Sequence, residues 1–70
     1  MQRTTVDSSS IAEIGFEAET QTLEIAFNDG SVYLYFGVAV ALRDALIESD
    51  SKGKFFNEKI RNRYAFVRVR

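Results

Sequence analysis

The 70-residue chain contains neither cysteine nor histidine. The absence of cysteine excludes disulfide bonds and thiolate zinc sites, and the absence of histidine excludes imidazole metal ligands and the Ser-His or Cys-His pairs of nucleophilic enzymes. A nucleophile among Ser8, Ser9 and Ser10 would need a lysine or a carboxylate as its base, so serines that form or cap a turn are the favoured interpretation. We therefore expect a protein that is not an enzyme and that uses no metal and no cofactor.

Long apolar segments are also missing. The N-terminal segment, MQRTTVDSSS, lacks the apolar core of a secretory signal, and no segment approaches the roughly 20 apolar residues that span a bilayer. Hydrophobic residues make up 46% of the chain and charged residues 27%, which is typical of a soluble globular domain. We expect residues 1–70 to form one cytoplasmic domain without a membrane partner. Its core should be thin, because a chain this short buries only about 60% of the surface that its unfolded form exposes.

Residues 13–36 show the alternation of apolar and polar residues that is typical of half-buried β-strands. The period of two appears in EIGFE and again in TLEIAF, and the joining segment EAETQT lacks large apolar residues, which indicates a turn. Residues 28–30, NDG, are a strong hairpin signal because glycine accepts the positive φ that such turns require, and residues 31–36 then return as a third strand. The end of the chain, YAFVRVR, alternates again and is a candidate fourth strand.

Helical spacing replaces the period of two after the third strand. The apolar residues of AVALRDALIESD predict an amphipathic helix, and a second helix is predicted in KGKFFNEKIRNR, with Ser51 as its cap and Phe56 and Ile60 on its inner face. Asp44 and Glu48 stand four residues apart on the first helix, and we interpret them as a solvated face rather than as a catalytic pair. The predicted fold class is α+β, with a small three- to four-stranded antiparallel meander and two short helices packed on one face.

The predicted hairpin leaves two registers open, and these place Tyr33 and Tyr35 on opposite faces of the sheet. A two-residue loop at residues 29–30 turns both tyrosines away from the face of Ile25. A three-residue loop at residues 28–30 with a glycine bulge pairs Ile25 with Tyr33 and turns both rings toward the core. A slip of one residue swaps the faces, and the third strand is apolar on both, so the pattern alone does not choose.

Charge is unevenly distributed along the chain. Residues 1–50 contain nine acidic and two basic residues, whereas residues 51–70 contain seven basic residues and one acid. Clustered bases gain free energy by releasing counterions from the phosphates of a nucleic acid. Alternatively, the basic end lies against acidic neighbours and neutralises them within the fold. Both interpretations stay open from the sequence.

RNA binding is the leading functional hypothesis, because single-stranded RNA is usually held by aromatic rings inside basic grooves. The candidate residues are Lys54, Lys59, Arg61 and Arg63 for phosphates, with Tyr64, Phe66 and Arg68 as a stacking and cationic surface. Tyr64 and Phe66 fit a core role in the last strand equally well. The alternative function is a protein-interaction module or a homodimer, in which the last strand is an exposed edge of the sheet.

Three segments in this order, SSSIAEIGF, TLEIAFNDGSVYLYFGV and SKGKFFNEKIRNRY, resemble the KTSC domain family. That family is named for a domain at the C-terminus of some lysyl-tRNA synthetases and also occurs as small stand-alone bacterial proteins. A Tyr-x-Tyr motif marks it, and Tyr33 and Tyr35 match that motif here. The resemblance implies a domain without an established activity, for which the association with synthetases suggests RNA binding.

The chain departs from the family pattern at three positions. Leu34 lies between the tyrosines, where family members commonly carry a polar residue, and Ala39 and Ala65 stand where many carry proline. These departures leave the implied fold unchanged and indicate an altered exposed surface. A polar residue between the tyrosines suits a strand whose tyrosines face inward, so the resemblance favours the three-residue loop and a core position for both rings. Their hydroxyl groups would still reach a partner or solvent at the sheet edge.

Overall fold

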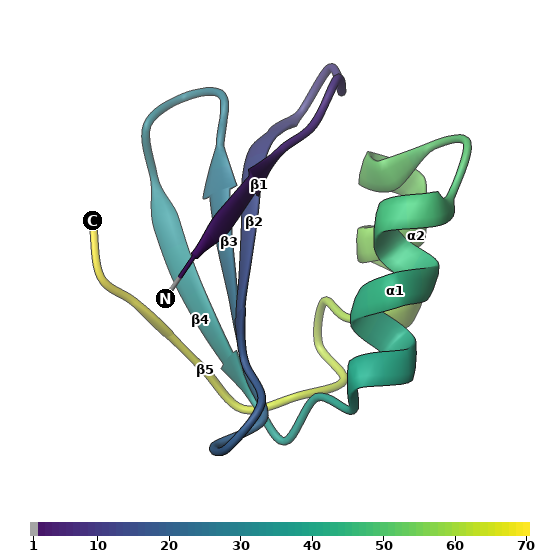
Figure 1. Ribbon diagram of the computed structural model, residues 1–70. Helices are drawn as coiled ribbons and strands as arrows, with labels where there is room; N and C mark the ends of the chain where they lie inside the picture. The colour runs from purple at the N-terminus through teal and green to yellow at the C-terminus, as the bar shows by residue number, and fades with distance from the viewer. Residues whose placement is uncertain (1) are drawn as a thin grey trace.

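The computed structural model describes residues 2–70, and Figure 1 shows an antiparallel sheet with two helices against one of its faces. Five strands lie side by side in chain order: β1 (Arg3–Thr5), β2 (Ile11–Glu17), β3 (Thr22–Phe27), β4 (Val32–Phe36) and β5 (Phe66–Arg68). The helices α1 (Val40–Glu48) and α2 (Lys52–Lys59) connect β4 to β5. The predicted α+β class, the antiparallel meander and the placement of both helices on one face are therefore confirmed.

The sheet has five strands rather than the predicted three to four, because β1 adds a strand that the sequence pattern does not indicate. Its residues, RTT, include no apolar side chain, so no alternation marks them. Arg3 anchors the strand instead: its guanidinium donates to Glu24 at 2.6 Å and to Glu13 at 2.9 Å. These two hydrogen bonds raise the pKa of Arg3. Salt bridges of Arg3 thus take the place of apolar side-chain contacts at this edge of the sheet.

The β3–β4 hairpin has the three-residue loop with the glycine bulge. Gly30 has a φ of +94°, and its N–H donates to the carbonyl oxygen of Phe27 at 3.0 Å. In this register Ile25 lies opposite Tyr33 and Leu23 lies opposite Tyr35. Both tyrosines are therefore on the face that the helices cover, as the resemblance predicts.

The core lies between this face of the sheet and the two helices. Its fully buried large side chains come from β2, β3, the β4–α1 connection, α1 and the residue that follows α2: Ile11, Ile14, Leu23, Ile25, Val38, Leu46 and Ile60. Tyr35 and Phe56 are 4% and 5% exposed and complete the cluster. The predicted inner pair of the second helix, Phe56 and Ile60, is confirmed as buried.

The helix ends differ from the sequence-based expectation. The second helix ends at Lys59, before the predicted RNR segment, because the chain turns there toward β5 and Asn62 takes the left-handed conformation with a φ of +63°. Ser51 occupies the N-cap position of α2, but its side chain makes no capping hydrogen bond; its carbonyl oxygen accepts the N–H of Phe55 at 3.0 Å. Within residues 2–70, neither helix has the length and apolar character needed to cross a membrane.

Candidate functional site

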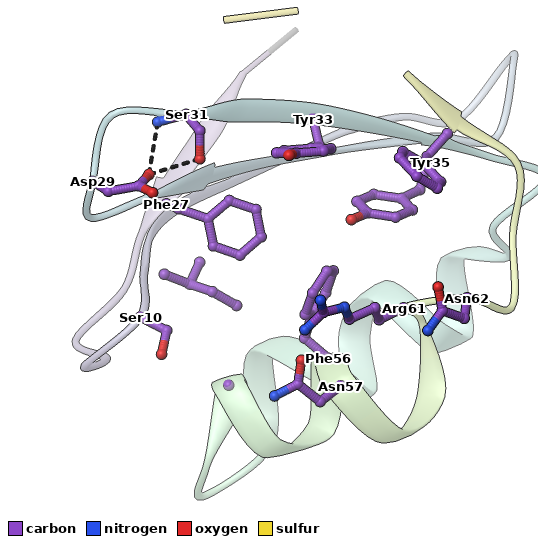
Figure 2. Close-up of a pocket in the computed structure, with 13 residues that line it drawn as sticks. Ser10, Phe27, Asp29, Ser31, Tyr33, Tyr35, Phe56, Asn57, Arg61 and Asn62 are labelled. Atoms are coloured by element: carbon purple, nitrogen blue, oxygen red, sulfur yellow. Dashed lines mark hydrogen bonds between the residues drawn. The ribbon is translucent and has the colours of Figure 1, made fainter. Parts of the chain in front are cut away.

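A groove of about 470 Å³ opens between the sheet and α2, as Figure 2 shows. This volume falls in the range of roughly 300–1,000 Å³ that is common for small-ligand sites. One wall comes from the β3–β4 hairpin and β4, and the other comes from α2 and the segment that follows it. We call this feature the aromatic groove because five rings line it: Phe27, Tyr33, Tyr35, Phe56 and Phe66.

Strand geometry sets the aromatic wall of the groove. Tyr33 and Tyr35 project from the same side of β4 because residues two apart share a strand face, and their rings stack with centroids 6.3 Å apart. Phe66 lies opposite Tyr35 on the neighbouring strand β5, with a centroid distance of 5.6 Å. Phe56 meets Tyr35 edge to face at 5.4 Å. Because Phe66 is also 52% exposed, part of this wall is open to solvent.

The ring of Tyr35 is buried, whereas its hydroxyl group is accessible from the groove. The Tyr35 hydroxyl makes no hydrogen bond within residues 2–70. Every buried side-chain oxygen or nitrogen in that range has a hydrogen-bond partner, so the Tyr35 oxygen is not buried and reaches the surface that lines the groove. Burial of the ring, and then the neighbouring Tyr33, raise the pKa of Tyr35, while Arg61 acts in the opposite direction. The phenol is therefore neutral near pH 7 and able both to donate and to accept a hydrogen bond.

Arg61 brings positive charge to the groove. Figure 2 shows its side chain reaching from the end of α2 toward the middle of the groove, with the amide side chains of Asn57 and Asn62 on the same wall. Salt bridges within residues 2–70 use only Arg3 and Arg43 as cations. The guanidinium of Arg61 is thus not neutralised by a carboxylate contact and remains able to bind an anion.

Asp29 brings negative charge to the groove from the tip of the hairpin. Its Oδ1 accepts the hydroxyl of Ser31 at 2.7 Å and the backbone N–H of Ser31 at 2.9 Å, and Figure 2 draws both bonds. The hydroxyl bond, followed by the backbone bond, lowers the pKa of Asp29. The second carboxylate oxygen makes no hydrogen bond within residues 2–70. Asp29 is therefore ionised, fixed in position and left with a free acceptor.

The hairpin tip is held in place by the serine-rich loop before β2. Asn28 donates its backbone N–H to the carbonyl oxygen of Ser10 at 2.8 Å and its side-chain amide to the carbonyl oxygen of Ser8 at 3.0 Å. The hydroxyl of Ser8 accepts the backbone N–H of Ser10 at 3.2 Å and of Ile11 at 3.3 Å. Ser8 thus closes a turn, as expected, and this turn positions the Asp29 end of the groove.

The structure brings several of the predicted site residues together. Arg61 and Phe66 line the aromatic groove beside the tyrosines of the family motif. Lys59 and Arg63 line a shallow basic depression that shares Arg61 with the groove. The guanidinium of Arg68 lies 5.9 Å from the ring centroid of Tyr33, a cation–π contact on the β5 side.

Two predicted site residues lie elsewhere. Tyr64 is half-buried against the core and lines neither depression, so its ring is not a free stacking platform. Lys54 is exposed on α2 and also lines neither one. The proposed internal neutralisation is not found at contact distance either, because the cations of the salt bridges within residues 2–70 all precede residue 51. The bases of residues 51–70 thus make no salt bridge within the described part of the chain.

Sequence reasoning did not identify Asp29, Asn57 or Asn62 as site residues. Asp29 belongs to the hairpin signal, and nothing in its spacing indicates that the turn would lie over a groove. Asn57 lies on α2 four residues before Arg61, and Asn62 follows Arg61 in the left-handed conformation. No local pattern marks these positions, since the groove forms from segments that are distant in the sequence.

A five-stranded meander covered on one face by a helix pair defines the class of this protein, and comparisons with known proteins give its family. The KTSC domain model matches residues 7–64. The crystal structure of a KTSC domain protein from Yersinia pestis superposes with a TM-score of 0.92 at 33% identity, covering 99% of this chain and 97% of that one. The chain belongs to the KTSC domain family.

Two relatives differ in size. An uncharacterized protein of Stutzerimonas stutzeri is 36% identical over 70 residues, covering 99% of each chain. A lysine–tRNA ligase of Nostoc punctiforme is 40% identical over 63 residues, which is 90% of this chain and only 11% of that protein. The same domain therefore occurs in proteins of this length and as a small part of a much longer enzyme.

Proposed function

We propose that the aromatic groove binds single-stranded RNA weakly, with bases against its rings and phosphates on the adjoining basic residues. The observation that carries this proposal is the position of Arg61, which has no salt bridge within residues 2–70 and lies in a groove lined by five aromatic rings. Single-stranded nucleic acid is held by this combination of aromatic rings and unpaired cations in many binding modules. Lys59 and Arg63 extend the cationic surface beyond the groove.

Two further observations support the proposal. Related segments form part of proteins named lysine–tRNA ligases, which is consistent with an RNA partner. Glu13 on β2 and Glu24 on β3 both form salt bridges with Arg3. They share the sheet face opposite Ile25, so they lie away from the groove. The proposal includes no catalytic step: Asp44, of the acidic pair on α1, is exposed and bound to Arg43 at 2.6 Å.

Salt dependence and a matched pair of arginine variants test this function. We expect a short RNA to shift backbone amide signals between residues 54 and 68 in an NMR titration at low salt. Each lost phosphate contact lowers the slope of log affinity against log salt by about 0.7 for single strands, so Arg61→Ala should flatten it by about that amount. Arg43→Ala is the control, because Arg43 is on α1, with its guanidinium 5.0 Å from the ring centroid of Phe16 on β2, and lines neither depression.

Arg43→Ala should leave both the affinity and its salt slope unchanged. If no amide in residues 54–68 shifts at low salt, the proposed RNA binding is wrong. If both variants flatten the slope equally, the effect comes from net charge rather than from the groove.

A second candidate function is supported by the opposite side of the sheet. Strand β5 is an exposed edge, and Phe36, Val67 and Val69 are 38%, 40% and 51% exposed. Val67 pairs with Leu34, so it shares the helix-free face with the alternate residues of β4. An edge strand with adjoining apolar side chains is suited to adding a strand from another protein or from a second copy.

A further inference from the structure

The aromatic groove carries opposite charges at two places. Asp29 lines it at the hairpin tip, and Arg61 lines it at the end of α2. Figure 2 shows the ring of Phe27 between these two side chains, with the tyrosines of β4 along the same wall. A ligand that matches this order has N–H donors at one end, a flat apolar body, and an anion at the other end.

We propose that the groove prefers guanine among the RNA bases, with the base against the rings, its N–H edge on Asp29 and an adjoining phosphate on Arg61. This inference rests on the proposed RNA binding and adds a base preference to it. It uses the one carboxylate that lines the groove within residues 2–70.

The hydrogen-bonding state of Asp29 decides which base edge fits. An ionised carboxylate only accepts hydrogen bonds, and Oδ1 already accepts two from Ser31, so a base must offer donors to Oδ2. Guanine presents two adjacent donors on its Watson–Crick edge, the N1–H and the 2-amino group. Adenine presents an amino group beside a ring nitrogen whose lone pair would face the carboxylate, and uracil has a single N–H between two carbonyl oxygens. Guanine therefore gains the most from this position.

The remaining polar atom of the guanine edge also finds a partner in the groove. The O6 oxygen of guanine accepts hydrogen bonds, and the accessible hydroxyl of Tyr35 and the amide of Asn57 are donors on the groove walls. A phosphate needs a cation without a competing carboxylate, and Arg61 meets this condition. Each polar part of a guanine nucleotide thus has a complementary group among the residues that line the groove.

Three RNA pentamers that differ in one base test the preference. We measure the affinities of UUGUU, UUIUU and UUAUU, where I is inosine, by NMR titration at low salt. We expect UUGUU to bind about tenfold more tightly than UUAUU, the discrimination typical of one well-placed base contact. UUIUU should lie between them, because inosine keeps the N1–H but lacks the 2-amino group.

The variant Asp29→Asn assigns the preference to the carboxylate. Asparagine keeps an oxygen for the Ser31 bonds and is favoured in turns, so the hairpin is retained, but it replaces the free acceptor by an N–H donor. We expect the guanine preference to fall to less than about twofold, well below the discrimination of an intact base contact, with the affinity for UUAUU unchanged. Asp50→Asn is the matched control, since Asp50 is exposed between α1 and α2 and does not line the groove.

The outcomes separate the base preference from RNA binding itself. Equal affinities for the three pentamers would overturn the guanine inference and leave the proposed RNA binding intact. Absence of binding by every pentamer would overturn both. If Asp29→Asn weakens all three pentamers equally at unchanged thermal stability, Asp29 does not select the base and the inference is again wrong.

Discussion

In Tyr35 the ring and the hydroxyl group lie in different surroundings. The ring packs between Phe56 and Phe66 and is almost fully buried, whereas the hydroxyl group faces the groove and makes no hydrogen bond within residues 2–70. The rings of the Tyr-x-Tyr motif therefore pack in or against the core, and in the proposed RNA site the Tyr35 hydroxyl would be available to a ligand. Tyr33 is more exposed than Tyr35 and carries the cation–π contact with Arg68.

We expect Tyr35→Ala to lower the free energy of unfolding by about 3 kcal/mol, the usual cost of truncating a large aromatic side chain in a core. Tyr35→Phe keeps the ring and removes only a hydroxyl that has no hydrogen bond within residues 2–70, so stability should change by less than about 0.5 kcal/mol. Chemical denaturation measures both values. A loss below about 0.5 kcal/mol for the alanine variant would place the ring on the surface and contradict this account.

At the scale of the elements, periodicity predicted the parts of the fold that bury apolar side chains. The period of two in β2 and β3 and the helical spacing of α1 and α2 follow from which side chains face the core, so these elements were predictable. The hairpin register was not, because Val32 and Leu34 are as apolar as the alternate tyrosines. Only the family resemblance favoured the correct register.

Elements without a buried face were less predictable. β1 is held by backbone pairing and by the salt bridges of Arg3 to Glu13 and Glu24, which lie 10 and 21 residues further along the chain. No local sequence pattern therefore predicts this strand. The basic half of the candidate site was predicted from charge alone. Of its aromatic wall, Phe66 and the two tyrosines were among the candidates. Asp29 was not, since the groove depends on how the hairpin and α2 meet.

Gly30 gives a direct test of the hairpin loop. A side chain at this position would meet no atom within 4 Å, so a substitution changes stability through backbone conformation alone. With a φ of +94°, Gly30→Ala should lower the free energy of unfolding by about 1–2 kcal/mol. Gly30→Asn should cost less, because asparagine tolerates positive φ better than alanine. Thermal denaturation of the two variants checks the order, and an alanine variant as stable as the parent chain would contradict the assigned loop.

At the scale of the whole molecule, the uneven charge of the sequence becomes a difference between surfaces. Glu13 and Glu24, which form salt bridges with Arg3, lie on the helix-free face. Lys59, Arg61 and Arg63 cluster where α2 ends. Apolar side chains of β4 and β5 occupy the rest of the helix-free face. The proposed RNA binding and the alternative strand addition would therefore use different faces of the sheet and respond differently to salt.

We expect the chain alone to be a monomer of 7.9 kDa at low salt. Antiparallel pairing of β5 with a second copy would bring the Arg68 and Arg70 side chains of both copies to one edge, where they repel each other. The repulsion is strong when the Debye length is about 30 Å near 0.01 M salt and weak when it is about 3 Å near 1 M, so any dimer should form only as salt is added. RNA affinity should fall over the same range. Multi-angle light scattering at both salt concentrations measures the mass, and a dimer already present at low salt would favour the interaction module over the RNA-binding function.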